Sequence, residues 1–211
     1  MYSLPYFKEN DEAEILAFLR ANPFATITGH DGEYPVSTHI PLEVEFDENG
    51  AMILRGHMMR KTDHHLALEK NNKVLVIFSG PHCYVSASWY TTPQSGSTWN
   101  YMTVHAKGTI SFTDEAGTYE AVKRVTNYFE GQGNPGSFDQ LPDSYINPML
   151  KAIVGFRIEV GSLENVFKLS QNRDEASFKN IIDRLRERGD HNSLCIAAEM
   201  EKRTGKLFGK E

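Results

Sequence analysis

The sequence predicts a mainly β fold with flanking helices, built as a closed or split barrel. Short runs rich in β-branched and aromatic residues recur along the chain, and turn signals such as Asp31-Gly32 and Asn49-Gly50 separate them. Apolar residues at helical spacing occur mainly toward the two ends of the chain. With 211 residues, the chain is expected to form a single domain, 1–211, that ends in helices.

The individual elements follow from these patterns in chain order. We expect strands at residues 24–28, 35–41, 42–46, 51–55, 73–78, 103–112 and 152–160. We expect helices near residues 11–21, 63–70, 113–129, 142–150, 174–188 and 193–204. Thr62 or Asp63 is suited to cap the second of these helices.

Residues 73–108 are the stretch around which the chain is organised. It begins with five consecutive apolar residues, 74–78, which are typical of a strand buried on both faces. Two aromatic-rich pieces follow on either side of a polar loop, and they read as neighbouring strands. Their aromatic, hydroxyl, amide and histidine side chains indicate a sheet that carries a flat, polar-edged ligand on its rim. A role in the core or in an interface fits the same aromatics equally well, namely Trp89, Tyr90, Trp99 and Tyr101.

Composition limits the class of protein. The net charge of −6 repels phosphate, so any DNA-facing surface would have to be local. Cys83 and Cys195 are far apart and lack metal-site spacing, which predicts reduced thiols in a cytoplasmic protein. The first residues lack a secretion signal, and no apolar run approaches the ~20 residues that a membrane span needs.

Several kinds of catalytic and metal site are not supported. The sequence has no Gly-x-Ser-x-Gly elbow and no glycine-rich nucleotide loop after a strand. Six histidines invite a metal site, but their spacing does not match one, so we expect none. They are His39, His57, His64, His65, His82 and His105.

Two concentrations of cations could bind an anion. Arg55, Arg60 and Lys61 lie where a strand gives way to a helix, and they can hold a phosphate or form a solvated basic edge. Lys168 and Arg173 bracket Leu-Ser-Gln-Asn, which can bind a carbonyl-rich or phosphate-bearing group or merely cap the next helix.

Specific motifs then recur in order over nearly the whole chain. They are Pro23-Phe24-Ala25-Thr26, His39-Ile40-Pro41-Leu42, Gly56-His57 with Arg60, Gly80-Pro81-His82-Cys83-Tyr84-Val85-Ser86, Ser88-Trp89-Tyr90, Thr98-Trp99-Asn100-Tyr101, Val104-His105, Ile153-Val154-Gly155-Phe156 and Lys168-Leu169-Ser170-Gln171-Asn172-Arg173. With these motifs the chain resembles the FMN-binding negative transcriptional regulators, the PaiB-like proteins. It departs from their pattern after Arg60, where Lys61-Thr62-Asp63 stands in place of Ala-Asn-Pro, and at Ala87.

The resemblance implies a split β-barrel like that of the pyridoxamine-phosphate oxidases, and a homodimer with FMN at the subunit interface. It implies that Arg60 and Lys61 hold the phosphate. The remaining residues implied at the flavin are His39, Ile40, Gly56 and His57 beside the ribityl chain and ring edge, Trp99, Asn100 and Tyr101 as a wall, and Lys168, Gln171 and Arg173, which reach it from the same or the other subunit.

The resemblance also implies the function, a flavin-dependent repressor. Direct DNA binding follows from the family name alone, although Arg184, Arg186 and Arg188 could provide a local basic face. The alternative is an FMN-dependent oxidoreductase, for which no catalytic residue can be named because the flavin performs the redox step. Haem binding, known among split-barrel relatives, is a third and weaker option.

Overall fold

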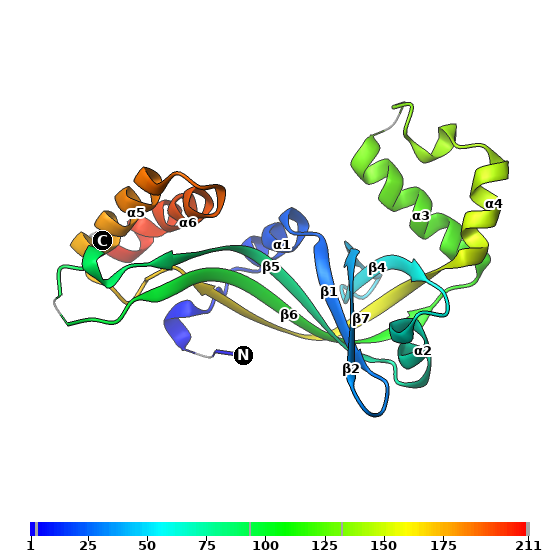
Figure 1. The fold of residues 1–211 in the computed structure, drawn as a ribbon, viewed down its shortest axis with the longest axis horizontal. Helices are drawn as coiled ribbons and strands as arrows, with labels where there is room; N and C mark the ends of the chain where they lie inside the picture. The colour runs from blue at the N-terminus through cyan, green and yellow to red at the C-terminus, as the bar shows by residue number, and fades with distance from the viewer. Residues whose placement is uncertain (3, 93, 132, 210–211) are drawn as a thin grey trace. The chain divides into compact units, whose positions relative to one another are not determined.

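The computed structural model describes residues 1–2, 4–92, 94–131 and 133–209, which form a seven-stranded sheet, α-helices and short 3-10 turns (Figure 1). The strands are β1 (Phe24–His30), β2 (Pro35–Pro41), β3 (Glu43–Phe46), β4 (Met52–Met59), β5 (Lys73–Val85), β6 (Thr98–Phe112) and β7 (Ile153–Lys168). Their order in the sheet is β2-β1-β5-β6-β7-β4-β3. The helices are α1 (Glu12–Ala21), α2 (Asp63–Lys70), α3 (Glu115–Glu130), α4 (Asp143–Ala152), α5 (Glu175–Arg188) and α6 (His191–Phe208). Short 3-10 turns occupy Pro5–Phe7, Ala87–Trp89 and Phe138–Gln140.

The chain divides into two compact units, which we call the barrel unit and the helical unit. The barrel unit consists of Leu19–Phe78 and His105–Leu163. The helical unit consists of Met1–Phe18, Ser79–Val104 and Glu164–Glu211. Each of the three long strands β5, β6 and β7 contributes one part to each unit. The expectation of a single domain stays a prediction.

The sheet of the barrel unit curls back on itself. β2 is at one edge of the sheet and β4 lies next to the other edge, yet the two strands are in contact. Gly56 in β4 permits this approach, because a Cβ atom there would lie 2.8 Å from Cζ of Phe156 and 3.3 Å from Cγ2 of Ile40 in β2. Side chains from all sides of this curl, such as Leu54 and Val76, are fully buried. The result is the split barrel that the strand pattern predicts.

The helical unit has a core of its own. Helices α5 and α6 pack against each other and bury Phe178, Ile181 and Ile196 completely. The carboxylate of Asp174 caps the start of α5 by accepting a hydrogen bond from the backbone amide of Ser177. Gly189 ends the helix in the left-handed conformation, with a φ of 73°, that glycine adopts without strain.

The expected elements are present, and several strands are longer than the ranges expected from the sequence, among them β4 and β5. β4 continues through Gly56 to Met59, because these residues keep their pairing with β7. β5 continues through Gly80, which reads as a break in the sequence. In the structure this glycine makes room for Phe18, whose Cε2 atom would lie 2.4 Å from an added Cβ. Glycine here marks a close approach of a side chain and not the end of the strand.

Helices that could cross a lipid bilayer are absent from the described residues, because none of them is both long enough and apolar enough.

Candidate functional site

A cavity of about 300 Å³ lies in the barrel unit where β2 approaches β4. β2 supplies Thr38, His39, Ile40 and Pro41, β4 supplies His57, Met58 and Met59, and the remaining wall comes from Thr62, His64 and Ile153. The same close approach that Gly56 permits therefore brings residues of two separate strands into one site. Apolar side chains with a few polar groups are the usual lining of a site for a small molecule.

His57 is the most unusual polar group in this cavity. Its Nδ1 atom is buried and has no hydrogen-bond partner in the structure. Burial lowers the pKa of His57 below its ordinary value of 6.5, so the ring is neutral at physiological pH. A buried polar atom without a partner is costly, and a ligand atom at this position would satisfy it. His39, across the cavity on β2, is exposed and lies against the ring of Phe24.

Arg60 and Lys61 follow directly after β4, in the turn that leads to α2. Nε of Arg60 donates a hydrogen bond to the carbonyl of Ile153, at 2.7 Å, which anchors this side chain to a residue of the cavity wall. Lys61 is exposed and has a φ of 61°, in the left-handed region that costs a residue with a side chain roughly 1–3 kcal/mol. Among the described residues, no carboxylate forms an ion pair with either cation.

The start of α2 completes this side of the cavity. Thr62 caps the helix by accepting a hydrogen bond from the backbone amide of His65, and its hydroxyl also contacts Nε2 of His64 at 3.0 Å. A helix start directs unpaired backbone N–H groups and a partial positive charge toward an anion. The exposed Asp63 engages the backbone and the ring of His64. Two cations and a helix start thus adjoin a cavity with a neutral histidine.

The other predicted site residues lie in the helical unit. Lys168 ends β7 and donates hydrogen bonds to the hydroxyl of Thr98 and to the carbonyl of Trp99. Burial, and then the nearby charge of Arg173, lower the pKa of Lys168. The guanidinium of Arg173 lies 3.8 Å from the centre of the Tyr90 ring, a cation–π contact.

Gln171 and Asn100 are engaged inside the protein. The Gln171 amide donates to the carbonyl of Phe167 at 2.5 Å and accepts from the backbone amide of Leu169 at 2.7 Å. Asn100 is fully buried, and its Oδ1 atom accepts a hydrogen bond from the hydroxyl of Ser170. These two amides hold the loop between β7 and α5 in place.

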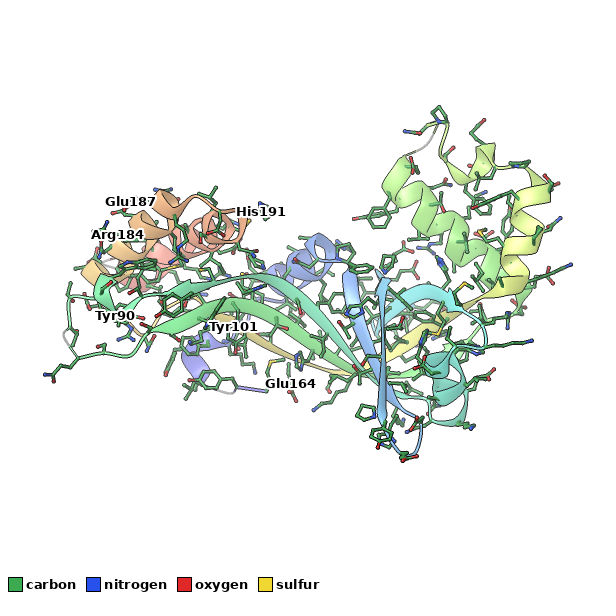
Figure 2. The ribbon with its side chains drawn as sticks, viewed as in Figure 1. Tyr90, Tyr101, Glu164, Arg184, Glu187 and His191 are labelled. Carbon is green, nitrogen blue, oxygen red and sulfur yellow. The ribbon has the colours of Figure 1, made fainter. Side chains whose placement is uncertain are left out.

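Alternation along β6 separates Asn100 from its two neighbours. Trp99 is 53% exposed, and its ring meets those of Tyr84 and His82 on β5 at centroid distances of 6.1 Å. Tyr101, which is labelled in Figure 2, is half-buried, and burial raises its pKa. Trp99 and Tyr101 therefore present an aromatic face, whereas Asn100 points into the core.

The twelve predicted residues fall into two groups of six. His39, Ile40 and His57 line one cavity, Gly56 shapes it, and Arg60 and Lys61 follow at its edge. Trp99, Asn100, Tyr101, Lys168, Gln171 and Arg173 belong to the helical unit. The sequence reading missed Thr62, His64 and Met59 as lining residues, although their proximity to Arg60 was a signal. In the part of the chain that the structure describes, no cluster of His, Cys, Asp or Glu is arranged to hold a metal ion.

Comparison with known proteins agrees with this architecture. Residues 1–162 match the family described as "Putative FMN-binding domain". Over 207 residues the chain is 33% identical to the Protease synthase and sporulation protein PAI 2 of Bacillus subtilis, covering 98% of this chain and 99% of that protein. An uncharacterised protein of Emericella nidulans, AN0679, is 27% identical over 96% of this chain and 97% of its own length.

Solved structures share the fold at low sequence identity. An FAD- and haem-binding protein from Mycobacterium smegmatis superposes with a TM-score of 0.59 at 16% identity, covering 77% of this chain and 73% of that one. The flavocytochrome Anf3 from Azotobacter vinelandii gives the same TM-score of 0.59 at 17% identity, covering 77% and 69% of the two chains. The chain therefore belongs to the PaiB-like family of FMN-binding proteins, and its cofactor is FMN.

Proposed function

We propose that this protein is a flavin-dependent regulator of the PaiB-like negative transcriptional type, and that FMN binds in the barrel-unit cavity. The observation that carries the proposal is the buried Nδ1 atom of His57, which lacks a partner in a cavity whose lining residues Met59 and Thr62 flank Arg60 and Lys61 in the sequence. A neutral hydrogen-bonding group near two cations that no described carboxylate pairs with matches a ligand with a polar ring and a phosphate.

The residues present fit FMN. Arg60, Lys61 and the start of α2 are suited to the phosphate dianion, because charge-assisted hydrogen bonds and the helix dipole act in the same direction. His57 can bond to a ring-edge or ribityl oxygen, and the apolar atoms of Ile40 and Met58 can pack on the flavin. When bound, FMN supplies one- and two-electron redox chemistry, which the protein tunes through such contacts.

The proposal includes a homodimer with the flavin at the subunit interface. A cavity of about 300 Å³ is at the small end of the range for ligand sites, and Met59 at its edge is 55% exposed. A wall from a second copy would enclose the ligand further. The exposed rings of Trp99, Tyr84 and His82 form an aromatic surface of the kind enriched in interfaces.

The proposal extends to the helical-unit residues. We assign Trp99, Asn100, Tyr101, Lys168, Gln171 and Arg173 to the flavin site of the dimer, either in contact with the ligand or as supports of a residue that is. Asn100 and Gln171 are supports, since their amides are engaged inside the protein. Both cysteines are free thiols, which supports the further proposal that the protein works in the reducing cytoplasm.

The phosphate assignment is tested by removing both cations. We expect Arg60→Ala with Lys61→Ala to weaken FMN binding by about 100- to 10,000-fold, because each of the two charge-assisted hydrogen bonds contributes roughly 1.5–3 kcal/mol. Binding of riboflavin, which lacks the phosphate, should hardly change. Titrations followed by flavin fluorescence measure both constants, and the matched control is Lys8→Ala with Lys70→Ala. Equal FMN affinity in the two double variants would refute the assignment.

The contact with DNA is tested at α5. Arg184 pairs with Glu187 at 2.8 Å, Arg186 pairs with Glu201 at 2.5 Å, and Arg188 donates to the carbonyl of Tyr84. Neighbouring carboxylates thus offset two of these three positive charges. We propose that it is not a DNA-binding face, and we expect Arg184→Ala with Arg186→Ala to leave any gel shift of upstream DNA unchanged. A shift present in the native protein and lost in this variant would contradict the expectation.

A further inference from the structure

Two cations flank the loop between β7 and α5, Lys168 at the end of the strand and Arg173 before the helix, and neither has an acidic partner among the residues that the structure describes. Nζ of Lys168 donates to two neutral oxygens, and the guanidinium of Arg173 stacks on the ring of Tyr90. Neither forms an ion pair with a carboxylate that the structure describes. The adjacent Asp174 is committed elsewhere, because Ser177 and Thr91 donate to its Oδ2 atom at 2.6 and 3.0 Å.

A shortage of carboxylates does not explain this lack of partners. The chain carries 28 carboxylate residues and 22 basic ones, and several arginines in the same unit find a partner, among them Arg186 and Arg203. Lys168 also experiences the positive charge of Arg173, which together with burial disfavours its ammonium form. An oxyanion bound to both groups would offset the repulsion.

The loop is fixed in a conformation that costs free energy. Ser170 is buried and has a φ of 63°, in the region where side chains other than glycine are strained. Its hydroxyl donates to Oδ1 of Asn100, and Gln171 bridges Phe167 and Leu169. Strain of this kind persists where the surroundings determine the conformation, which is frequent at binding sites.

Tyr90 provides an independent sign of a ligand. Its hydroxyl group is buried without a hydrogen-bond partner, on the ring that the Arg173 guanidinium covers at 3.8 Å. Tyr90 lies beside α5, where Asn180 donates to the carbonyl of the preceding Trp89 at 2.7 Å (Figure 2). Stacking on the ring leaves the N–H edges of the guanidinium available, and these edges match a carboxylate or phosphate.

We propose that Lys168 and Arg173 form an oxyanion site that takes the carboxylate or phosphate group of a small ligand other than the flavin. The inference rests on the proposed function in one respect: Arg60 and Lys61 hold the FMN phosphate, which leaves the helical-unit cations for the anionic group of a second ligand. In this inference, Lys168 and Arg173 serve the flavin site of the dimer by binding the carboxylate or phosphate group of a second ligand.

Calorimetric titration of the full chain tests this inference. Inorganic phosphate and malonate are titrated at constant ionic strength into the FMN-loaded and the FMN-free protein. We expect saturable binding of at least one probe, and the stronger probe identifies the chemical source of the oxyanion. Arg173→Gln and Lys168→Met should each weaken that binding by at least about tenfold, as expected for a charge-assisted contact. The matched control Arg184→Gln should bind like the native protein.

Flavin affinity separates this inference from the proposed function. The Arg60→Ala, Lys61→Ala variant should lose FMN affinity and still bind the oxyanion, whereas Arg173→Gln should weaken oxyanion binding in the FMN-loaded and the FMN-free protein alike. Loss of oxyanion binding in the Arg60→Ala, Lys61→Ala variant would overturn the inference, and so would the absence of saturable binding in the native protein. Equal weakening in Arg184→Gln would overturn it as well. If circular dichroism shows that Arg173→Gln does not fold, Arg173→Lys takes its place. That variant keeps the charge but loses the guanidinium group that can donate two parallel hydrogen bonds. Unchanged oxyanion affinity in it would refute the bidentate contact.

Discussion

Two segments of this molecule each present a pair of cations before a helix, and the two helices begin in different ways. The turn after β4 carries Arg60 and Lys61, and the loop after β7 carries Lys168 and Arg173. Both hold a residue other than glycine at positive φ, 61° in one and 63° in the other, and both lead into a capped helix. In neither loop does a described carboxylate form an ion pair with the cations.

The difference lies in how each following helix begins. The hydroxyl of Thr62 caps α2, and the exposed carboxylate of Asp63 accepts a hydrogen bond from the backbone amide of His64, so only the rest of that helix start is available to an anion beside the cavity. The carboxylate of Asp174 caps α5, and hydrogen bonds from Ser177 and Thr91 hold its pKa at about 2. An anion at the second loop therefore depends on side chains alone. The first loop suits a phosphate dianion, whereas the second suits an anion recognised by a planar fork.

The largest expected effect on stability comes from substituting two glycines, one in each unit. An added methyl group at Gly56 would lie 2.8 Å from Phe156 in the barrel, and one at Gly80 would lie 2.4 Å from Phe18 in the helical unit. We expect Gly56→Ala and Gly80→Ala each to lower the free energy of unfolding by roughly 1–3 kcal/mol, as overpacking does. Urea denaturation measures both losses, and Gly96→Ala, with no neighbouring atom within 4 Å, is the control.

Ligand binding distinguishes the same two variants. Gly56→Ala should weaken FMN binding, because it pushes β2 away from β4 at the cavity, while Gly80→Ala should leave FMN affinity within about twofold. A variant at Gly80 that loses FMN as strongly as the one at Gly56 would contradict the assignment of the flavin to the barrel unit.

An intermediate effect concerns the pH dependence of stability in the barrel unit. Burial lowers the pKa of His57 from its ordinary value of 6.5, so on acidification the unfolded chain takes up a proton before the folded protein does. His57 thus has no cost above about pH 6.5, and the free energy of unfolding falls as the pH drops below that value. We expect His57→Gln to flatten this acid limb between pH 7 and 5. Urea denaturation across that range checks the prediction, with His82→Gln of the helical unit as the control. An acid limb that stays equally steep in His57→Gln would show that another group causes it.

Local patterns in the sequence predicted most of the fold. β2 begins and ends at the predicted residues, 35–41, because proline and glycine punctuate the chain there. The predicted cap Thr62 does cap α2. The curl that brings Ile40 over Gly56 is a contact between residues distant in sequence, and no local period reports it. The family resemblance supplied Gly56 and His57, whereas the packing that makes Gly56 necessary became visible only in the structure.

For the candidate site, too, the sequence motifs did not show which way each side chain faces. Reading Thr98 to Tyr101 as one motif placed Trp99, Asn100 and Tyr101 on a single wall, yet successive residues of a strand face opposite sides. Applying that alternation would have separated the buried Asn100 from the exposed Trp99. The spacing of Lys168 and Arg173 in the sequence did not indicate that the carboxylate of Asp174 accepts a hydrogen bond from Ser177. That arrangement, which leaves the two cations unpaired, depends on how the helix start folds.

The smallest effect sharpens the comparison between the two strained residues. Lys61→Gly should relieve the left-handed conformation and raise the free energy of unfolding by about 0.5–1 kcal/mol, because no buried contact of the Lys61 side chain is lost. Ser170→Gly relieves the same strain but removes the hydroxyl that donates to the buried Asn100, which costs roughly 1–3 kcal/mol. We therefore expect the first variant to be stabilised and the second to be unchanged or destabilised in thermal and urea unfolding. If both are stabilised equally, the hydrogen bond of Ser170 contributes nothing, and the loop after β7 is no more rigidly determined than the turn after β4. If Lys61→Gly is destabilised instead, the lysine side chain itself holds the turn after β4 in place.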